Sequence, residues 1–261
     1  MVAGIVTYIF ILVFLFVFQR KLQYLPQGEI QDVSQYQLDE FIEKKLTTKD
    51  GVEIFCWFKA PQNNQKIILY FHGNAGNMGD RSDKFKVFAQ DFGVMAISYR
   101  GYSKSPGEPS EQGLMNDANA ALDFLLAQGY QQKDIILFGE SLGSGVAVQL
   151  AAQHGDFAML FLESPYSSIA SVAQKQYWFV PVAMLLKDKF ESIKFITKIH
   201  SPVLIIHGTE DRIVAFEEGE KLFVVANQPK KFVKIDKAGH LDFSEGNLLK
   251  EMRDFLEQNG R

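Results

Sequence analysis

The stretch Ile135-Ile-Leu-Phe-Gly-Glu-Ser-Leu-Gly143 joins four apolar residues to a serine flanked by glycines, and a helix-forming run begins at Leu142. This order of strand, sharp turn and helix fits the pattern G-x-S-x-G, in which the serine lies on a strained turn. The flanking glycines are required because a Cβ at either position would clash with the neighbouring element. We therefore expect Ser141 to be an exposed nucleophile at the carboxyl end of a strand; a chance glycine–serine turn is the alternative.

A serine hydroxyl is a weak nucleophile and needs an adjacent base, which an acid holds in one tautomer. Of the five histidines, only His240 lies after Ser141 in a Gly-His turn between a predicted strand and a predicted helix. Asp211 follows another predicted strand, and the order serine, aspartate, histidine is that of a hydrolase triad. We predict Ser141 as nucleophile, His240 as base and Asp211 as the orienting acid, with Glu210 as the alternative acid.

Acyl transfer also needs donors directed at the developing oxyanion. We predict the backbone N–H of Leu142 as one donor and that of Asn74, in the glycine-rich loop after the strand 66–71, as the other. The loop could instead cradle a phosphate, but no Gly-Lys-Ser/Thr follows and the G-x-G-x-x-G spacing is not met. We expect His72 and His207 to bond loop backbone. No H-x-x-x-H or C-x-x-C pair supports a metal site, and no cofactor is predicted.

Strand-like and helix-like segments alternate along the chain, which implies a mostly parallel sheet wrapped by helices. The expected strands are nearly continuous apolar runs, as in strands covered on both faces: 52–58, 66–71, 94–99, 134–138, 158–162, 203–206 and 231–235. The expected helices are 80–91, 111–128, 142–154, 216–226 and 241–258. The aromatic-rich interval 164–201 lacks a clear strand and could be helical cover over a pocket.

Composition narrows the class of protein. The 261 residues are 47% hydrophobic and 22% charged, close to the values of an ordinary globular chain. The net charge is −4 and no Lys or Arg run is long enough to follow a phosphate backbone, so a nucleic-acid partner is not expected. The single cysteine, Cys56, excludes an intramolecular disulfide.

The amino terminus is unusually apolar. From Val2 to Phe18 only Gly4 and Thr7 interrupt the apolar run, which predicts a helix at the short end of what spans a bilayer. No basic residue precedes the run and no A-x-A-like site follows it, which argues against a cleaved signal. We predict an anchor over 1–21, a linker over 22–38 and a catalytic domain over 39–261. A buried core helix is the alternative reading of 2–18.

The basic residues Arg20 and Lys21 follow this apolar run. The positive-inside rule would therefore put the catalytic domain on the cytoplasmic side. We accordingly expect a single-pass membrane protein whose domain faces the cytoplasm.

Five motifs together resemble the membrane-tethered α/β-hydrolase domain proteins, relatives of eukaryotic protein depalmitoylases. The motifs are His72-Gly-Asn-Ala-Gly-Asn77, Tyr99-Arg-Gly-Tyr-Ser-Lys-Ser105, Gly139-Glu-Ser-Leu-Gly143, His207-Gly208 with Asp211, and Gly239-His240. Ser98 and Ser103 depart from residues common in these relatives, and neither belongs to the predicted triad. The resemblance implies the α/β-hydrolase fold with a minimal lid and cofactor-free hydrolysis of esters or thioesters.

The sequence thus predicts a serine hydrolase that cleaves small-molecule or lipid-linked acyl substrates near a membrane through an acyl-enzyme. A peptidase acting on short peptides is the alternative within the same chemistry. A catalytically idle membrane scaffold is the alternative outside it, although a scaffold has no need of a serine on a strained turn beside a base.

Overall fold

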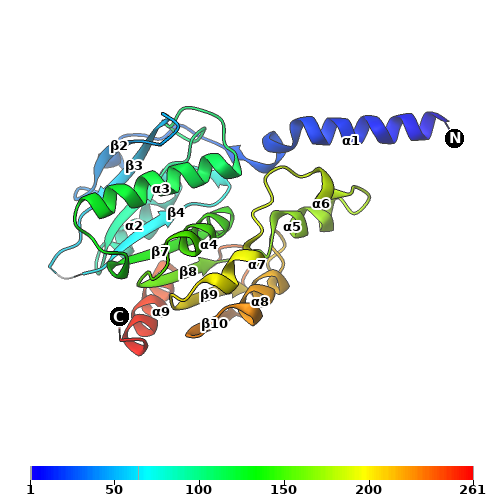
Figure 1. Cartoon of the computed structure of the whole chain (residues 1–261). Coiled ribbons are helices and arrows are strands. Elements are labelled where there is room, and N and C mark those ends of the chain that lie inside the picture. The colour runs from blue at the N-terminus through cyan, green and yellow to red at the C-terminus, as the bar shows by residue number, and fades with distance from the viewer. Residues whose placement is uncertain (1, 64, 261) are drawn as a thin grey trace.

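A central sheet of eight strands organises the part of the chain that the computed structural model describes, residues 2–63 and 65–260. Its strands follow the order β10-β9-β8-β7-β4-β6-β3-β2 (Figure 1). The six from β10 to β6 in this order are parallel, whereas β3 is antiparallel to both of its neighbours. The strands are β2 (Ile42–Thr47), β3 (Glu53–Lys59), β4 (Ile67–Phe71), β6 (Gly93–Ile97), β7 (Ile135–Glu140), β8 (Met159–Glu163), β9 (Val203–Gly208) and β10 (Lys230–Ile235).

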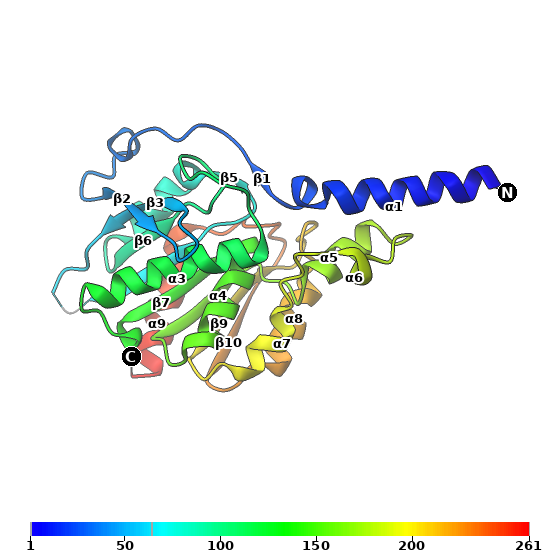
Figure 2. The ribbon, with the colours of Figure 1, turned by 45° about the horizontal axis from the view of Figure 1, so that its top comes forward.

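Helices cover both faces of the sheet, which confirms the predicted three-layer α/β architecture (Figures 1 and 2). One hydrophobic cluster includes residues of α3 (Glu111–Ala127), α4 (Leu142–His154) and α8 (Phe216–Val225). The other includes residues of α2 (Ser82–Phe88) and α9 (Glu245–Gln258). Alternate residues of β4 belong to the two clusters, so both faces of this strand are dry, and its sequence is accordingly apolar without a break.

Strand β2 is absent from the expected strands, although it completes the sheet at one edge. Its sequence, Ile-Glu-Lys-Lys-Leu-Thr, is mostly polar and only Leu46 is buried. Charged side chains are a common way to protect an edge strand from pairing with another chain. The apolar runs that identify the central strands are therefore missing here for a physical reason.

Helix α1 (Val2–Gln23) projects from the body of the protein (Figures 1 and 2). Its 22 residues correspond to about 33 Å at 1.5 Å per residue, close to the thickness of a bilayer's hydrocarbon core. The mean hydropathy of its most apolar 18-residue window is 2.5, and only 6% of that window is buried. By length and composition α1 is able to cross a membrane.

The segment after α1, predicted to be a linker, packs against the rest of the protein. Strand β1 (Leu25–Pro26) pairs in parallel with β5 (Ala75–Gly76), and Ile30 and Leu38 are buried in the core. These apolar side chains are spaced too irregularly to give a helical or strand period, so the sequence pattern does not reveal that the segment packs.

Three short helices lie in the interval 164–201: α5 (Ile169–Gln176), α6 (Val182–Leu185) and α7 (Ser192–Phe195). Helices α5 and α6 extend beyond the carboxyl ends of the strands, beside α1 (Figures 1 and 2). The expectation of helical cover over a pocket agrees with this arrangement, and residues 169–186 are called the α5–α6 segment below.

Candidate active site

Ser141 lies on the sharp turn between β7 and α4, with φ 48° and ψ −112°. This backbone conformation is strained for a residue with a side chain. A Cβ at Gly139 would lie 2.6 Å from the carbonyl oxygen of Gly143, and one at Gly143 would collide with the carbonyl of Phe71. The predicted reason for the two glycines is therefore confirmed. Ser141 is held in its strained conformation by close backbone packing on both sides.

The structure brings Ser141, His240 and Asp211 together at the carboxyl ends of the strands. His240 Nε2 lies 3.0 Å from Ser141 Oγ, and His240 Nδ1 lies 2.7 Å from Asp211 Oδ2. Because an ionised carboxylate only accepts hydrogen bonds, Nδ1 carries the proton and Nε2 is left to accept from the serine hydroxyl. This is the tautomer that a general base for Ser141 requires.

Asp211 is almost inaccessible to solvent and receives several hydrogen bonds. Its Oδ1 accepts from the backbone N–H groups of Ile213 and Val214, each at 2.9 Å. Burial by itself raises its pKa, but hydrogen bonds from His207 and His240 outweigh that effect and hold the pKa of Asp211 well below its usual range. The carboxylate therefore stays ionised over the whole neutral range.

His207 has a contact that the sequence did not reveal. Its Nε2 bonds the carbonyl oxygen of Val214 at 2.9 Å, as expected for a structural histidine, and also lies 3.2 Å from Asp211 Oδ2. The i to i+4 spacing of His207 and Asp211, across a strand end and a turn, is the only sequence signal for this contact. His207 and His240 thus both contact Oδ2 of Asp211, and together they help to hold its carboxylate in place. Glu210, the alternative acid, is exposed to solvent.

Asn74 and Leu142, the residues predicted to supply oxyanion donors, line the same pocket as Ser141. The side chain of Asn74 is itself held in place, because its Oδ1 accepts from the backbone N–H of Leu25 at 3.1 Å and from the hydroxyl of Tyr102 at 3.2 Å. His72, just before this loop, contacts the carbonyl oxygen of Gly73 through Nδ1 at 2.7 Å, in agreement with the expected structural role.

A buried network of charges lies directly beneath the serine turn. Glu140 contacts Arg81 at 2.7 Å and Lys84 at 3.1 Å, and Lys84 also contacts Glu163 at 2.7 Å. The hydroxyl of Tyr70 donates to Glu140 as well. Since the backbone N–H of Ser141 bonds the carbonyl oxygen of Glu163 at 2.9 Å, the network supports the position of the turn.

The pKa values of the two carboxylates in this network are shifted in opposite directions. Burial raises the pKa of Glu140, but the charges of Lys84 and Arg81 outweigh it and bring the pKa well below its usual range. Burial raises the pKa of Glu163 to about 7 against the opposing charge of Lys84, and the Glu140 carboxylate adds to the increase. Sequence reasoning missed this network, because its members come from separate elements and only Glu140 lies within a recognised motif.

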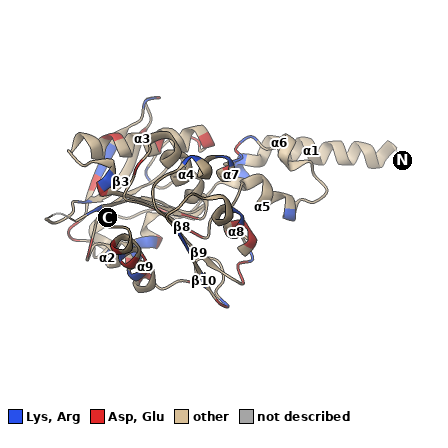
Figure 3. Ribbon diagram, turned by 60° about the horizontal axis from the view of Figure 1, so that its bottom comes forward, with Lys and Arg blue, Asp and Glu red and all other residues tan. Residues whose placement is uncertain are grey.

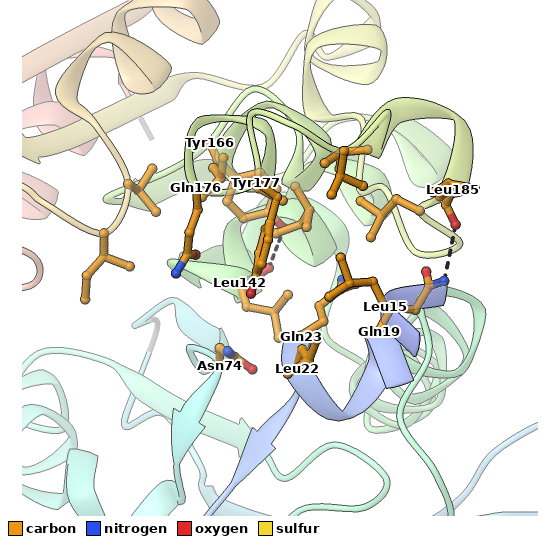
Figure 4. Close-up of a pocket in the computed structure, with 18 of the residues that line it drawn as sticks. Leu15, Gln19, Leu22, Gln23, Asn74, Leu142, Tyr166, Gln176, Tyr177 and Leu185 are labelled. Carbon is orange, nitrogen blue, oxygen red and sulfur yellow. Dashed lines mark hydrogen bonds between the residues drawn. The ribbon is translucent and has the colours of Figure 1, made fainter. Parts of the chain in front are cut away.

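A pocket of about 260 Å³ opens beside Ser141 and Leu142. Its walls come from α1, from the α5–α6 segment and from the turn after β9, and most of its lining side chains are apolar. Figure 4 shows Leu15 and Leu22 of α1 on one side of this space and Tyr177 on the other, with Gln19 directed toward Leu185. Among residues 2–63 and 65–260, no group of three or more His, Cys, Asp or Glu side chains is arranged to hold a metal ion.

A family model described as serine aminopeptidase, S33, matches residues 62–195, which include the serine turn and the α5–α6 segment. The chain belongs to the α/β-hydrolase family. It is a hydrolase by that membership, and the resemblance inferred from the five motifs is confirmed.

Two relatives and one solved structure illustrate the similarity. An uncharacterized protein of Mycobacterium tuberculosis is 35% identical over 95% of this chain and 90% of its own length. The α/β hydrolase domain-containing protein 17B of Homo sapiens is 34% identical over 81% of this chain and 73% of its own length. The esterase Pf2001 of Pyrococcus furiosus superimposes with a TM-score of 0.73 over 90% of this chain and 98% of that one, at 17% identity, and thus shares the fold.

Proposed function

We propose that this hydrolase cleaves carboxylic esters or thioesters of acyl groups at a membrane, through an acyl-enzyme on Ser141. The observation that carries the proposal is the hydrogen-bonded chain from Asp211 through His240 to Ser141, at one end of an apolar pocket. An apolar pocket can bind the acyl chain of a substrate, and the three side chains can carry out nucleophilic attack on its carbonyl carbon.

The proposed reaction has two halves. Ser141 Oγ attacks the carbonyl carbon while His240 Nε2 takes the hydroxyl proton, and the backbone N–H groups of Leu142 and Asn74 stabilise the oxyanion. His240 then gives the proton to the leaving alcohol or thiol, which leaves an acyl-enzyme. Water, deprotonated by His240, hydrolyses that ester and restores Ser141. Asp211 stabilises the imidazolium that forms in both halves.

The membrane location is part of this proposal. In it, α1 crosses the bilayer once, and Arg20 and Lys21 at its carboxyl end favour the cytoplasmic side for the domain. Residues 39–261 form the catalytic domain and 22–38 connect it to the anchor. An enzyme held at the bilayer meets lipid-borne substrates at a high effective concentration.

Hydrolysis of short peptides is the second candidate, because the matching family model is described as a serine aminopeptidase. A purified full-length protein in detergent would be assayed on p-nitrophenyl esters of graded chain length, on acyl thioesters and on aminoacyl anilides, beside Ser141→Ala. The proposal expects hydrolysis of esters and thioesters that Ser141→Ala abolishes. Hydrolysis of the anilides alone would favour the peptidase. Hydrolysis of none of these substrates would favour a catalytically idle scaffold.

A further inference from the structure

We infer that the pocket between α1 and the α5–α6 segment binds the acyl chain of a membrane lipid ester or thioester, and that this chain enters from the bilayer. The inference rests on the function proposed above and adds to it the source of the substrate. In this account α1 is a wall of the substrate site in addition to being an anchor.

One face of α1 lines the pocket. Leu15, Gln19 and Leu22 recur at helical spacing, and together they form a wall opposite α5 and α6 (Figure 4). Because Ser141 and Leu142 line the same pocket, a chain lying against this wall has the nucleophile within its own cavity. Without α1 the pocket would lose this side and open to its surroundings.

Polar contacts fix α1 in this position. Gln19, the buried residue of the helix, donates to the carbonyl oxygen of Leu185 at 3.2 Å and accepts from the backbone N–H of Lys187 at 2.6 Å. Arg20 Nε bonds Asp188 Oδ2 at 2.7 Å, and the Asp188 side chain is only 5% exposed. The end of α1 is therefore docked on the segment that covers the active site rather than loosely tethered to it.

The outer part of the α5–α6 segment is apolar where it leaves the domain. Residues 177–186 contain no charged side chain, yet Trp178 is 79% and Met184 83% exposed. Figure 3 shows α6 and most of α1 without charge, while acidic and basic residues are scattered over the rest of the molecule. An exposed apolar surface shared by two neighbouring elements is typical of a membrane contact.

The depth of this contact follows from α1. The hydroxyl of Tyr8 donates to the carbonyl oxygen of Phe179 at 2.7 Å. Tyr8 precedes Gln19 by about three helical turns, or roughly 16 Å along the axis, which is about half of a bilayer's hydrocarbon thickness. If Gln19 and Arg20 lie at the membrane–water interface, the part of the α5–α6 segment around Phe179, called the tip below, reaches deep into one leaflet.

The backbone of the tip is suited to an environment without water. Gln174 Nε2 donates to the carbonyl oxygens of Tyr177 at 3.2 Å and Val180 at 3.0 Å. The hydroxyl of Tyr8 donates to the carbonyl oxygen of Phe179. In lipid, non-helical backbone is tolerated only where such groups find partners inside the protein. A loop that remained in water would have no need of these side-chain donors.

Charged residues return at the level of the expected interface. Lys187 Nζ lies 4.4 Å from the ring centre of Phe16, and Asp188 pairs with Arg20 as described above. The apolar parts of α1 and of the α5–α6 segment thus end at the same level along the axis of α1, that of the expected membrane–water interface. An acyl chain in the leaflet beside them can reach Ser141 through the pocket, along a path that does not cross water.

The first test uses larger side chains on each wall to reduce the space in the pocket. Leu22→Trp on α1 and Ala173→Phe on α5 would be assayed in phosphatidylcholine vesicles with p-nitrophenyl palmitate and p-nitrophenyl acetate. Matched controls are Val17→Trp, on the opposite side of α1, and Ala183→Phe, exposed on α6; neither residue lines the pocket. Since an acetyl group has no chain to lie between these walls, only the palmitate reaction should respond.

We expect Leu22→Trp and Ala173→Phe each to lower kcat/KM for palmitate about ten-fold or more and to leave acetate within about two-fold. Both controls should resemble the wild type on both esters. If Leu22→Trp behaves like Val17→Trp, α1 is not a wall of the acyl site and the inference is wrong. A wild type inactive on both esters would instead overturn the proposed function itself.

The second test reports immersion of the tip without using activity. The chain has two tryptophans, of which Trp57 is buried and Trp178 is exposed. In vesicles of phosphatidylcholine brominated on its acyl chains, the emission of the wild type should be strongly quenched relative to plain lipid. The emission of Trp178→Phe, which comes from Trp57 alone, should hardly change. Equal wild-type emission in both lipids would show that the tip lies outside the bilayer and would overturn the inference.

Discussion

The serine turn and the α1 face of the pocket lie on either side of the same cavity, but they are held in opposite ways. The serine turn is marked by a short motif, because Gly139, Ser141 and Gly143 lie within five residues, although Gly143 also packs against the carbonyl of Phe71. The α1 face depends on contacts such as that from Gln19 to Leu185, which are separated by 166 residues. The serine turn can thus be recognised from a short stretch of sequence, whereas the pocket wall on α1 is formed by long-range packing.

The largest expected effect tests the chemical side of this comparison. Asp211→Asn should lower kcat by about 10⁴-fold with little change in stability, because the amide favours the wrong tautomer of His240. The matched change Glu210→Gln, on the exposed neighbour, should stay within a few-fold of wild type. Steady-state kinetics on p-nitrophenyl acetate measure both. If Glu210→Gln were the crippling change, the acid would be misassigned.

The next effect tests whether the turn depends on backbone packing. Gly143→Ala puts a Cβ against the carbonyl of Phe71, and we expect a loss of roughly 3 kcal/mol or more of unfolding free energy. Gly246→Ala in α9 is the control, since nothing lies within 4 Å of the added Cβ and alanine favours a helix by about 0.5–1 kcal/mol. Thermal unfolding in detergent compares the two. Equal melting temperatures would contradict the packing argument.

A pH series tests the charges beneath the turn. Because the pKa of Glu163 is about 7 in the folded chain and near 4.3 when unfolded, the native state holds more protons between these values. The stability linked to neutral Glu163 is therefore fully present below the unfolded pKa and is lost as pH rises through about 7. Relative to Glu163→Gln, the wild type should lose up to about 1.4 kcal/mol per pH unit in this window. Urea unfolding from pH 5 to 8 measures the free energy of unfolding of both proteins. If that free energy changed with pH by the same amount in the wild type and in Glu163→Gln, the prediction would be wrong.

The smallest effect concerns the docked end of α1. Arg20→Ala removes the ion pair with Asp188, in which Arg20 is 45% exposed, so its contribution is at most about 1 kcal/mol. We expect a rise of about three-fold in KM for long-chain esters and none for acetate. An equal rise for both esters would mean that the pair stabilises the domain as a whole.

The central sheet and the serine turn follow from the sequence because each is specified by a short pattern. Strand β4 is recognisable since both of its faces are buried, and Ser141 since its turn needs two glycines. Strand β2 could not be predicted, because an exposed edge strand keeps polar residues. The contact between His207 and Asp211 depends on the shape of one loop, which no spacing rule specifies.

The pocket wall made by α1 lies furthest from what sequence alone can predict. The apolar run over 2–18 indicates a bilayer-spanning length, but it does not indicate which face of the helix meets the protein. That face carries Gln19 and Gln23, which bond Leu185, Lys187 and Asp188, more than 160 residues away. These two glutamines at the end of the apolar run are a local sign of such docking.

The most direct measurement of the central claim is covalent labelling of the nucleophile. Full-length protein in detergent would be treated with a fluorophosphonate and examined by intact-mass and peptide mass spectrometry, beside Ser141→Ala and Ser144→Ala. Only a serine activated by an adjacent base attacks phosphorus readily. The account predicts one adduct, on the peptide that contains Ser141, in the wild type and in Ser144→Ala, and none in Ser141→Ala. Undiminished labelling of Ser141→Ala, or an unlabelled wild type, would contradict it.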